Sequence, residues 1–164
     1  MEALAPGNAA PPISLKTLEG DAATLADALK KGPVVAAFFK VSCPTCQFSA
    51  PFLQRLHETY AGENFTVWGI SQDGAAATED FRKEFDLRFP ILLEAKGYAL
   101  SNRYGITHVP SIFLIAQDGK IQESSVGFSK AELEKMASAA AQASSVKPAP
   151  LFKPSEMVPA LKPG

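Results

Sequence analysis

The chain has 164 residues, of which 46% are hydrophobic, and its 16 lysines and arginines nearly balance its 17 aspartates and glutamates. This length and composition predict one folded domain with a packed core rather than a disordered chain. The near-neutral charge, without any run of like charges, argues against a surface for nucleic acid or anionic lipid. No stretch approaches the roughly 18 consecutive apolar residues of a membrane span, and residues 1–12 lack the features of a signal peptide. On these grounds we expect a cytoplasmic protein, and the alternative is an extracytoplasmic protein whose signal peptide has been removed.

Prolines gather in residues 1–12 and 143–164, which predicts irregular ends around an ordered middle. In the middle, apolar runs alternate with helical patterns, as is typical of α/β proteins. Asp118-Gly119 predicts a tight hairpin, so the last two strands are expected to be antiparallel and the sheet mixed. In chain order we expect a strand over 13–18, a helix over 24–31, a strand over 34–39, a helix over 44–60, a strand over 65–70, a helix over 77–85, a strand over 91–93, a short helix over 99–104, strands over 112–116 and 120–126, and a last helix that opens at a capping box formed by Ser129 and Glu132.

The central strand and the helix after it have the clearest patterns. Residues 34–39 are six consecutive apolar residues, which predicts a strand buried on both faces. After this strand, Phe48, Phe52, Leu56 and Tyr60 recur at every fourth position and predict one apolar helix face. The helix over 77–85 is marked by Ala77, Phe81 and Phe85 in the same way.

The two cysteines of the chain, Cys43 and Cys46, lie where the central strand meets this helix. Pro44 suits the first helical turn, because its missing N–H would have no partner within the helix, and this leaves Cys43 as the cap. The free N–H groups and the helix dipole are expected to favour the Cys43 thiolate, and a lowered pKa makes a cysteine nucleophilic near neutral pH. Cys46, one turn further along, is expected to be more shielded. Since the two sulfurs can join as a disulfide, the pair can exchange two electrons.

Two structural explanations of the cysteines are weaker. A zinc site needs about four ligands, and His57 and His108 stand at spacings that match no common zinc pattern. A structural disulfide across four residues would close too short a loop to add much stability. We therefore expect redox chemistry, without a metal and without a bound cofactor.

Further motifs agree with this expectation. The stretch from Phe38 to Cys46 is followed by Pro51 within the helix and, much later, by Val109-Pro110 before a strand. Together with residues 5–15, 67–73, 89–92, 104–106 and 113–120, this pattern resembles the thioredoxin superfamily, and most closely the TlpA-like and AhpC/TSA-type redoxins. The resemblance covers about residues 5–142. It implies a thioredoxin-like three-layer α/β fold with a mixed central sheet flanked by helices, a redoxin-type N-terminal extension, and an inserted helix and strand over residues 75–93.

The resemblance also implies roles for individual residues. Cys43 would be the attacking cysteine, Cys46 the resolving one, and Pro110 a cis proline that faces the pair. A cis proline turns the chain sharply and leaves the backbone of Val109 free to pair with an extended substrate. Between the two cysteines, Pro44 and Thr45 complete the candidate residues for substrate binding or pKa tuning.

The sequence departs from the family at three points. Ser42 and Ser49 stand where such redoxins often carry an aromatic residue and a glutamate, and residues 36–38 lack the acidic residue that thioredoxin keeps beneath the cysteines. The base that deprotonates Cys46 is therefore unassigned. Lys40 and His108 are candidates for tuning the thiolate or relaying protons, and the alternatives are a solvated lysine and an ordinary loop histidine.

These observations favour a thiol-disulfide oxidoreductase that reduces or exchanges disulfides in protein substrates and is regenerated by an external thiol donor. A peroxiredoxin-like peroxidase is the first alternative. Against it, Lys40 stands three residues before Cys43, where peroxiredoxins usually carry a hydroxyl group.

The second alternative is a non-catalytic binding module that acts through the Pro-rich C-terminal tail, residues 143–164, which follows the redoxin domain of residues 1–142. The prolines of this tail favour extended structure. Its apolar residues, among them Leu151 and Phe152, are too many for a plain linker. We expect the tail to dock, either on its own domain or on a partner.

Overall fold

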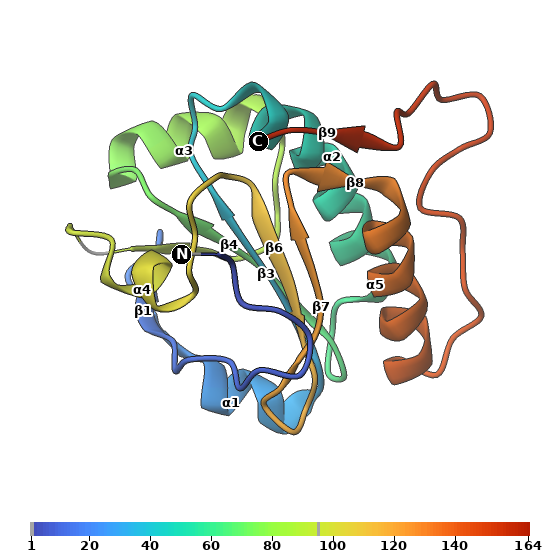
Figure 1. Ribbon diagram of the computed structural model, residues 1–164, viewed down its shortest axis with the longest axis horizontal. Coiled ribbons are helices and arrows are strands. Elements are labelled where there is room, and N and C mark those ends of the chain that lie inside the picture. The colour runs from blue at the N-terminus through green and yellow to red at the C-terminus, as the bar shows by residue number, and fades with distance from the viewer. Residues whose placement is uncertain (1, 95) are drawn as a thin grey trace.

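The computed structural model describes residues 2–94 and 96–164. In this part of the chain the centre of the fold is a seven-stranded sheet with the strand order β2-β1-β5-β4-β3-β6-β7 (Figure 1). The neighbours β3–β4 and β4–β5 are parallel, and the other pairs are antiparallel, so the sheet is mixed as predicted. The strands of this sheet are β1 (Ser14–Thr17), β2 (Ala22–Thr24), β3 (Val34–Phe39), β4 (Thr66–Ser71), β5 (Ile91–Leu93), β6 (Ser111–Ile115) and β7 (Ile121–Val126).

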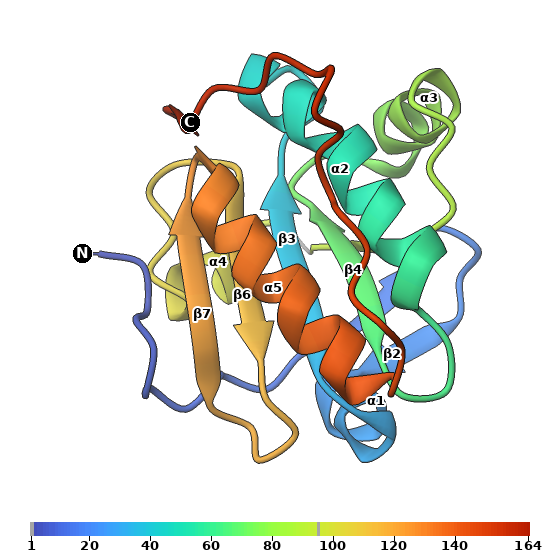
Figure 2. The ribbon, with the colours of Figure 1, turned by 90° about the vertical axis from the view of Figure 1, so that its right-hand side faces the viewer.

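Helices cover both faces of this sheet, which makes the fold three-layered (Figure 2). On one face lie α2 (Pro44–Tyr60), α3 (Ala75–Glu84) and α5 (Lys130–Ala143), and on the other lie α1 (Leu25–Lys31) and α4 (Ala99–Arg103). Side chains of β3 alternate between the two cores, with Val35 and Phe39 on the α2 side and Val34 and Phe38 on the α1 side. This explains why the strand is apolar throughout.

Two helices begin at side-chain caps that their sequences offer. Thr24 caps α1 by accepting the N–H of Asp27, and the hydroxyl of Ser129 accepts the N–H of Glu132 at the start of α5. The predicted apolar face of α3 was wrong at Ala77. This residue is exposed, and Thr78 is buried in its place. A threonine is tolerated there because its hydroxyl lies 2.7 Å from that of Ser71, so neither group is left without a partner.

The tail that follows α5 lies on its own domain and runs beside α2 (Figure 2). Its short strand β9 (Leu161–Lys162) pairs antiparallel with β8 (Phe128–Ser129), which precedes α5. The side chains of Leu151 and Phe152 belong to the same buried cluster as the inner residues of α2 and α5. Among the described residues, none of the helices is both long and apolar enough to cross a membrane.

Candidate active site

Cys43 occupies the cap position at the start of α2, at the end of the short turn that follows β3. Pro44 takes the first helical position, where no N–H is needed. The Sγ atom of Cys43 accepts the N–H of Cys46 at 3.2 Å, so the sulfur lies at the positive end of the helix. Both cysteines are free thiols, and Cys43 is the partly exposed one.

The loop before β6 reaches the same point from the other side. The Cys43 thiol donates a hydrogen bond to the carbonyl oxygen of Val109 at 3.4 Å. The Val109–Pro110 peptide bond is cis, and Pro110 is buried against the same apolar void as Cys46. The fold therefore brings the cysteine pair together with the proline loop, as the sequence resemblance implied.

Cys46 is almost fully enclosed, with 3% of its surface exposed. Burial raises the pKa of its thiol far above the ordinary value, and the hydrogen bond with Cys43 and the negative charge of Asp73 act in the same direction. Ala37, Ala50 and Leu53 are among the residues that line the void around this thiol. Cys46 therefore stays protonated at pH values where an exposed thiol ionises, and the two sulfurs have different roles.

Asp73 is a site residue that the sequence analysis did not single out. One oxygen of its carboxylate, Oδ2, accepts the N–H of Val41 at 2.8 Å, and the side-chain amide of Gln47 donates to the carbonyl of Val41 at 2.9 Å. These two bonds fix the turn between β3 and α2 that carries Cys43. A signal for Asp73 was present, because it follows β4, the parallel neighbour of β3, and the carboxyl ends of parallel strands share one edge.

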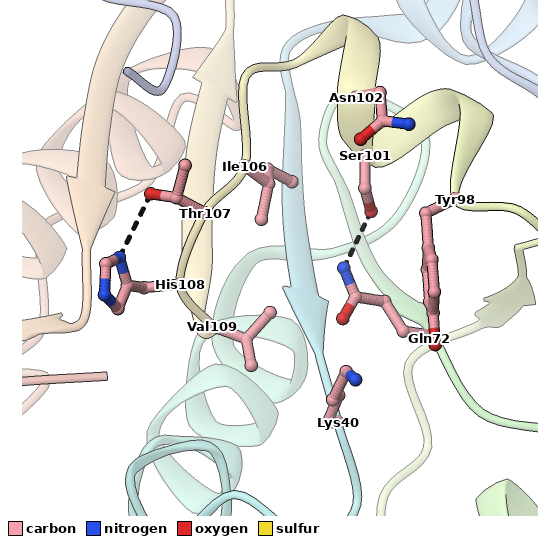
Figure 3. Close-up of a pocket in the computed structure, with 9 residues that line it drawn as sticks. All are labelled: Lys40, Gln72, Tyr98, Ser101, Asn102, Ile106, Thr107, His108 and Val109. Carbon is pink, nitrogen blue, oxygen red and sulfur yellow. Dashed lines mark hydrogen bonds between the residues drawn. The ribbon is translucent and has the colours of Figure 1, made fainter. Parts of the chain in front are cut away.

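A cavity of about 240 Å³ opens beside Val109 (Figure 3). Lys40 and His108 both line it, with the Lys40 ammonium group 5.3 Å from the centre of the Tyr98 ring. The exposed His108 ring bonds through Nδ1 to the hydroxyl of Thr107 at 3.0 Å. The roles of Lys40 and His108 in proton handling stay predictions, because their side chains contact Tyr98 and Thr107 rather than a cysteine.

Thr45 is buried for a reason the sequence did not suggest. Its hydroxyl donates to the carbonyl oxygen of Pro163 in the tail at 2.6 Å.

Within the described residues, no group of three or more His, Cys, Asp or Glu side chains is placed to hold a metal ion. The chemistry that the site offers is thiol chemistry, with one accessible sulfur and one shielded sulfur beside it.

Comparison with known proteins agrees with this geometry. The model of the AhpC/TSA family matches residues 6–124. The chain belongs to the AhpC/TSA family. It is 32% identical over 133 residues to the thioredoxin-like protein YneN of Bacillus subtilis, which covers 78% of this chain and 76% of that protein. It is also 32% identical over 130 residues to the thiol-disulfide oxidoreductase ResA of Bacillus thuringiensis, which covers 78% of this chain and 74% of ResA.

A solved structure shows the same fold. The thioredoxin domain of a thiol-disulfide oxidoreductase from Bacteroides vulgatus superimposes with a TM-score of 0.74 at 24% identity, over 83% of this chain and 97% of that one. The thioredoxin-like fold is thus confirmed. With Cys43 and Cys46 as its redox pair, this member of the AhpC/TSA family is a thiol-disulfide oxidoreductase.

Proposed function

We propose that this redoxin reduces or exchanges disulfide bonds in protein substrates, with Cys43 as the attacking and Cys46 as the resolving cysteine. The observation that carries the proposal is the unequal environment of the two sulfurs. The Cys43 sulfur is partly exposed at a helix N-terminus, whereas Cys46 is buried with a raised pKa. A nucleophile has to meet its substrate as a thiolate, and a resolving thiol does better to stay protonated until the mixed disulfide exists.

The reaction has two exchange steps. The Cys43 thiolate attacks one sulfur of the substrate disulfide, so that a Cys43–substrate disulfide forms and the other substrate sulfur leaves as a thiolate. Cys46 then loses its proton and attacks the Cys43 sulfur, which forms the internal disulfide and releases the second substrate thiolate. Two electrons pass from the protein to the substrate, and the two substrate thiolates take up two protons. An external dithiol reverses the change in the protein.

The surroundings of Cys46 determine which step is harder. The void around this thiol is lined by groups such as Ala37 and Pro110, and the described residues place no carboxylate in its lining. The hydroxyl of Ser49 is engaged with the carbonyl of Thr45 at 2.8 Å. Since no lining side chain is a strong base, deprotonation of Cys46 is expected to limit the second step, so the mixed disulfide should live long enough to be observed.

Trapping that intermediate tests the proposal. A reduced Cys46→Ser variant is mixed with insulin, a disulfide-bonded protein. It should accumulate a mixed disulfide through Cys43, which dithiothreitol cleaves. The matched Cys43→Ser variant, which retains only the buried sulfur, should form almost none. Equal trapping by the two variants, or trapping by neither, would contradict the assigned roles.

The proposal also covers the direction of electron flow and the compartment in which the protein works. We infer a reductase that draws on a cytoplasmic dithiol donor, for which a potential near the low end of the Cys-x-x-Cys range, about −270 mV, is appropriate. A potential near −120 mV, the oxidising end of that range, would instead indicate an oxidant that works outside the cytoplasm.

A further inference from the structure

The C-terminal tail follows α2 backwards, from the last turn of the helix to its first (Figure 2). At the far end, the hydroxyl of Tyr60 accepts the N–H of Ala149 at 2.9 Å. In the middle, the guanidinium group of Arg55 donates to both carboxylate oxygens of Glu156, at 2.6 and 2.7 Å. This path delivers the last residues of the chain to the end of α2 that carries Cys43.

The end of the tail and the Cys43 sulfur both lie against the carbonyl oxygen of Val109. A β-carbon added at Gly164 would overlap the carbonyl oxygen of Val109. The Cys43 thiol bonds to this same oxygen at 3.4 Å, and the preceding residue of the tail, Pro163, accepts the Thr45 hydroxyl between the two cysteines. A substrate that approaches Cys43 over Val109 and Thr45 therefore meets the tail first.

The tail is held there as an added strand. Lys162 pairs with Phe128 and Leu161 with Ser129, and the N–H of Lys130 donates to the carbonyl of Ala160 at 2.9 Å (Figure 1). Pairing along a strand edge recognises backbone rather than sequence, and it is a common way to bind an extended peptide.

Two features of the surface add selectivity to this pairing. Gly127 has a φ of 75°, and a β-carbon there would overlap the carbonyl of Lys162, so only glycine leaves room for the added strand. The ammonium group of Lys162 lies 5.1 Å from the centre of the Phe48 ring, a distance that suits a cation–π contact. The surface therefore fits an extended chain with a basic residue over Phe48.

We propose that Gly127, Phe128, Thr45 and Val109 form a groove for an extended peptide, and that residues 160–164 of the chain occupy it as an internal competitor of protein substrates. The competition rests on the proposed function, whereas the occupancy of the groove does not. Because the tail and a substrate need the same backbone edge and the same space above Cys43, a protein disulfide reaches the sulfur only after residues 160–164 have left.

Release of this segment does not require the rest of the tail to move. Leu151 and Phe152 anchor the middle of the tail in the core, whereas Leu161 is 71% exposed and buries little apolar surface. The segment is retained by backbone pairing, the Thr45 bond and the contact of Lys162 with Phe48. Contacts of this kind are each weak in water, so the segment can open while the anchor holds.

Substitutions in the whole chain of residues 1–164 test the groove. Gly164→Ala introduces a β-carbon that cannot coexist with Val109 in its place, and Lys162→Pro removes an N–H from the strand that pairs with Phe128. The matched controls are Gly62→Ala, where an added β-carbon meets nothing within 4 Å, and Met157→Ala, a tail side chain that is 99% exposed.

The first readout is the rate at which reduced protein exchanges with insulin, compared with the small hydroxyethyl disulfide. Both tail variants should react at least fivefold faster with insulin and less than twofold faster with the small disulfide, while both controls stay within twofold of the parent. A synthetic peptide of residues 159–164 should slow the variants again. Unchanged or slower reaction of both tail variants with insulin would overturn the proposal.

The second readout is independent of the proposed function. Cys43 is alkylated with iodoacetamide or with a polyethylene-glycol maleimide, and the modified cysteine is identified by peptide mass. Occupancy predicts that the tail variants gain at least fivefold in rate with the bulky maleimide and little with iodoacetamide. If parent and variants react with the maleimide at equal rates, the tail does not occupy the groove. If no variant exchanges with insulin although Cys43 is alkylated normally, the proposed function fails and this readout still decides on the tail.

Discussion

Replacement of Phe152 by alanine tests whether the tail belongs to the folded core. The Phe152 side chain is 9% exposed, and its ring centre lies 4.9 Å from that of Phe52 and 6.0 Å from that of Phe128. Burial of one such ring contributes about 1.5–3 kcal/mol, and the aromatic pairing adds about 0.5–1.5 kcal/mol. We therefore expect Phe152→Ala to lower the free energy of unfolding by about 3 kcal/mol.

The measurement is urea unfolding of the reduced protein, followed by circular dichroism. With a slope of about 2 kcal/mol per M, the midpoint should fall by about 1.5 M. Met157→Ala is the control in the same tail, and because that side chain is 99% exposed its effect should stay within about 0.5 kcal/mol. A loss below about 0.5 kcal/mol for Phe152→Ala would mean that the tail adds nothing to the stability of the domain, contrary to its place in the core.

Three further predictions concern ionisation and reactivity. Hydrogen bonds from Arg55 and from the backbone of Lys153 lower the pKa of Glu156 from 4.5 to about 2, so this stabilisation is present above pH 4.5 and disappears as the pH falls toward 2. With Glu156→Gln, stability should fall less as the pH drops from 4.5 to about 2. The urea midpoint is measured at several pH values, and a midpoint that falls as steeply with pH in the variant as in the parent would contradict the role of the ion pair. Burial raises the pKa of Cys46, so above about pH 9 the unfolded chain ionises this thiol while the folded protein keeps it protonated. The reduced protein should therefore lose stability as the pH rises above about 9. The Cys46→Ala variant should lose less stability over the same pH range. Hydrogen peroxide should oxidise Cys43 no faster than an ordinary thiolate, as thiol loss against time will show, and a rate many times higher would favour a peroxidase.

Local signals were sufficient for most of the fold. The six apolar residues of β3 and the four-residue spacing along α2 are properties of contiguous segments, and both elements have the predicted bounds. The position of Cys43 at the helix start follows from Pro44 in the same way. For α3 the existence of the helix was predictable, but its buried face was not, because a partner on β4 allows Thr78 to lie inside.

Contacts between distant segments were beyond the reach of these signals. Thr45 and Pro163 are separated by 118 positions, and Arg55 and Glu156 by 101, so no periodicity relates them. The apolar residues of the tail led to the prediction that it docks, but they did not distinguish its own domain from a partner as the docking surface. Only the packed structure places the tail over Val109 and shows that Asp73 holds the turn before Cys43.

Equilibrium redox titration decides whether Cys43 and Cys46 form one two-electron couple. The protein is equilibrated in buffers of defined thiol-disulfide ratio, its free thiols are alkylated, and the mass shift is read at each potential. We expect both thiols to disappear together in one transition, in which the ratio of oxidised to reduced protein changes tenfold for about 30 mV. If no internal disulfide forms at any potential, or if the two thiols titrate separately as single cysteines, Cys43 and Cys46 are not a redox couple.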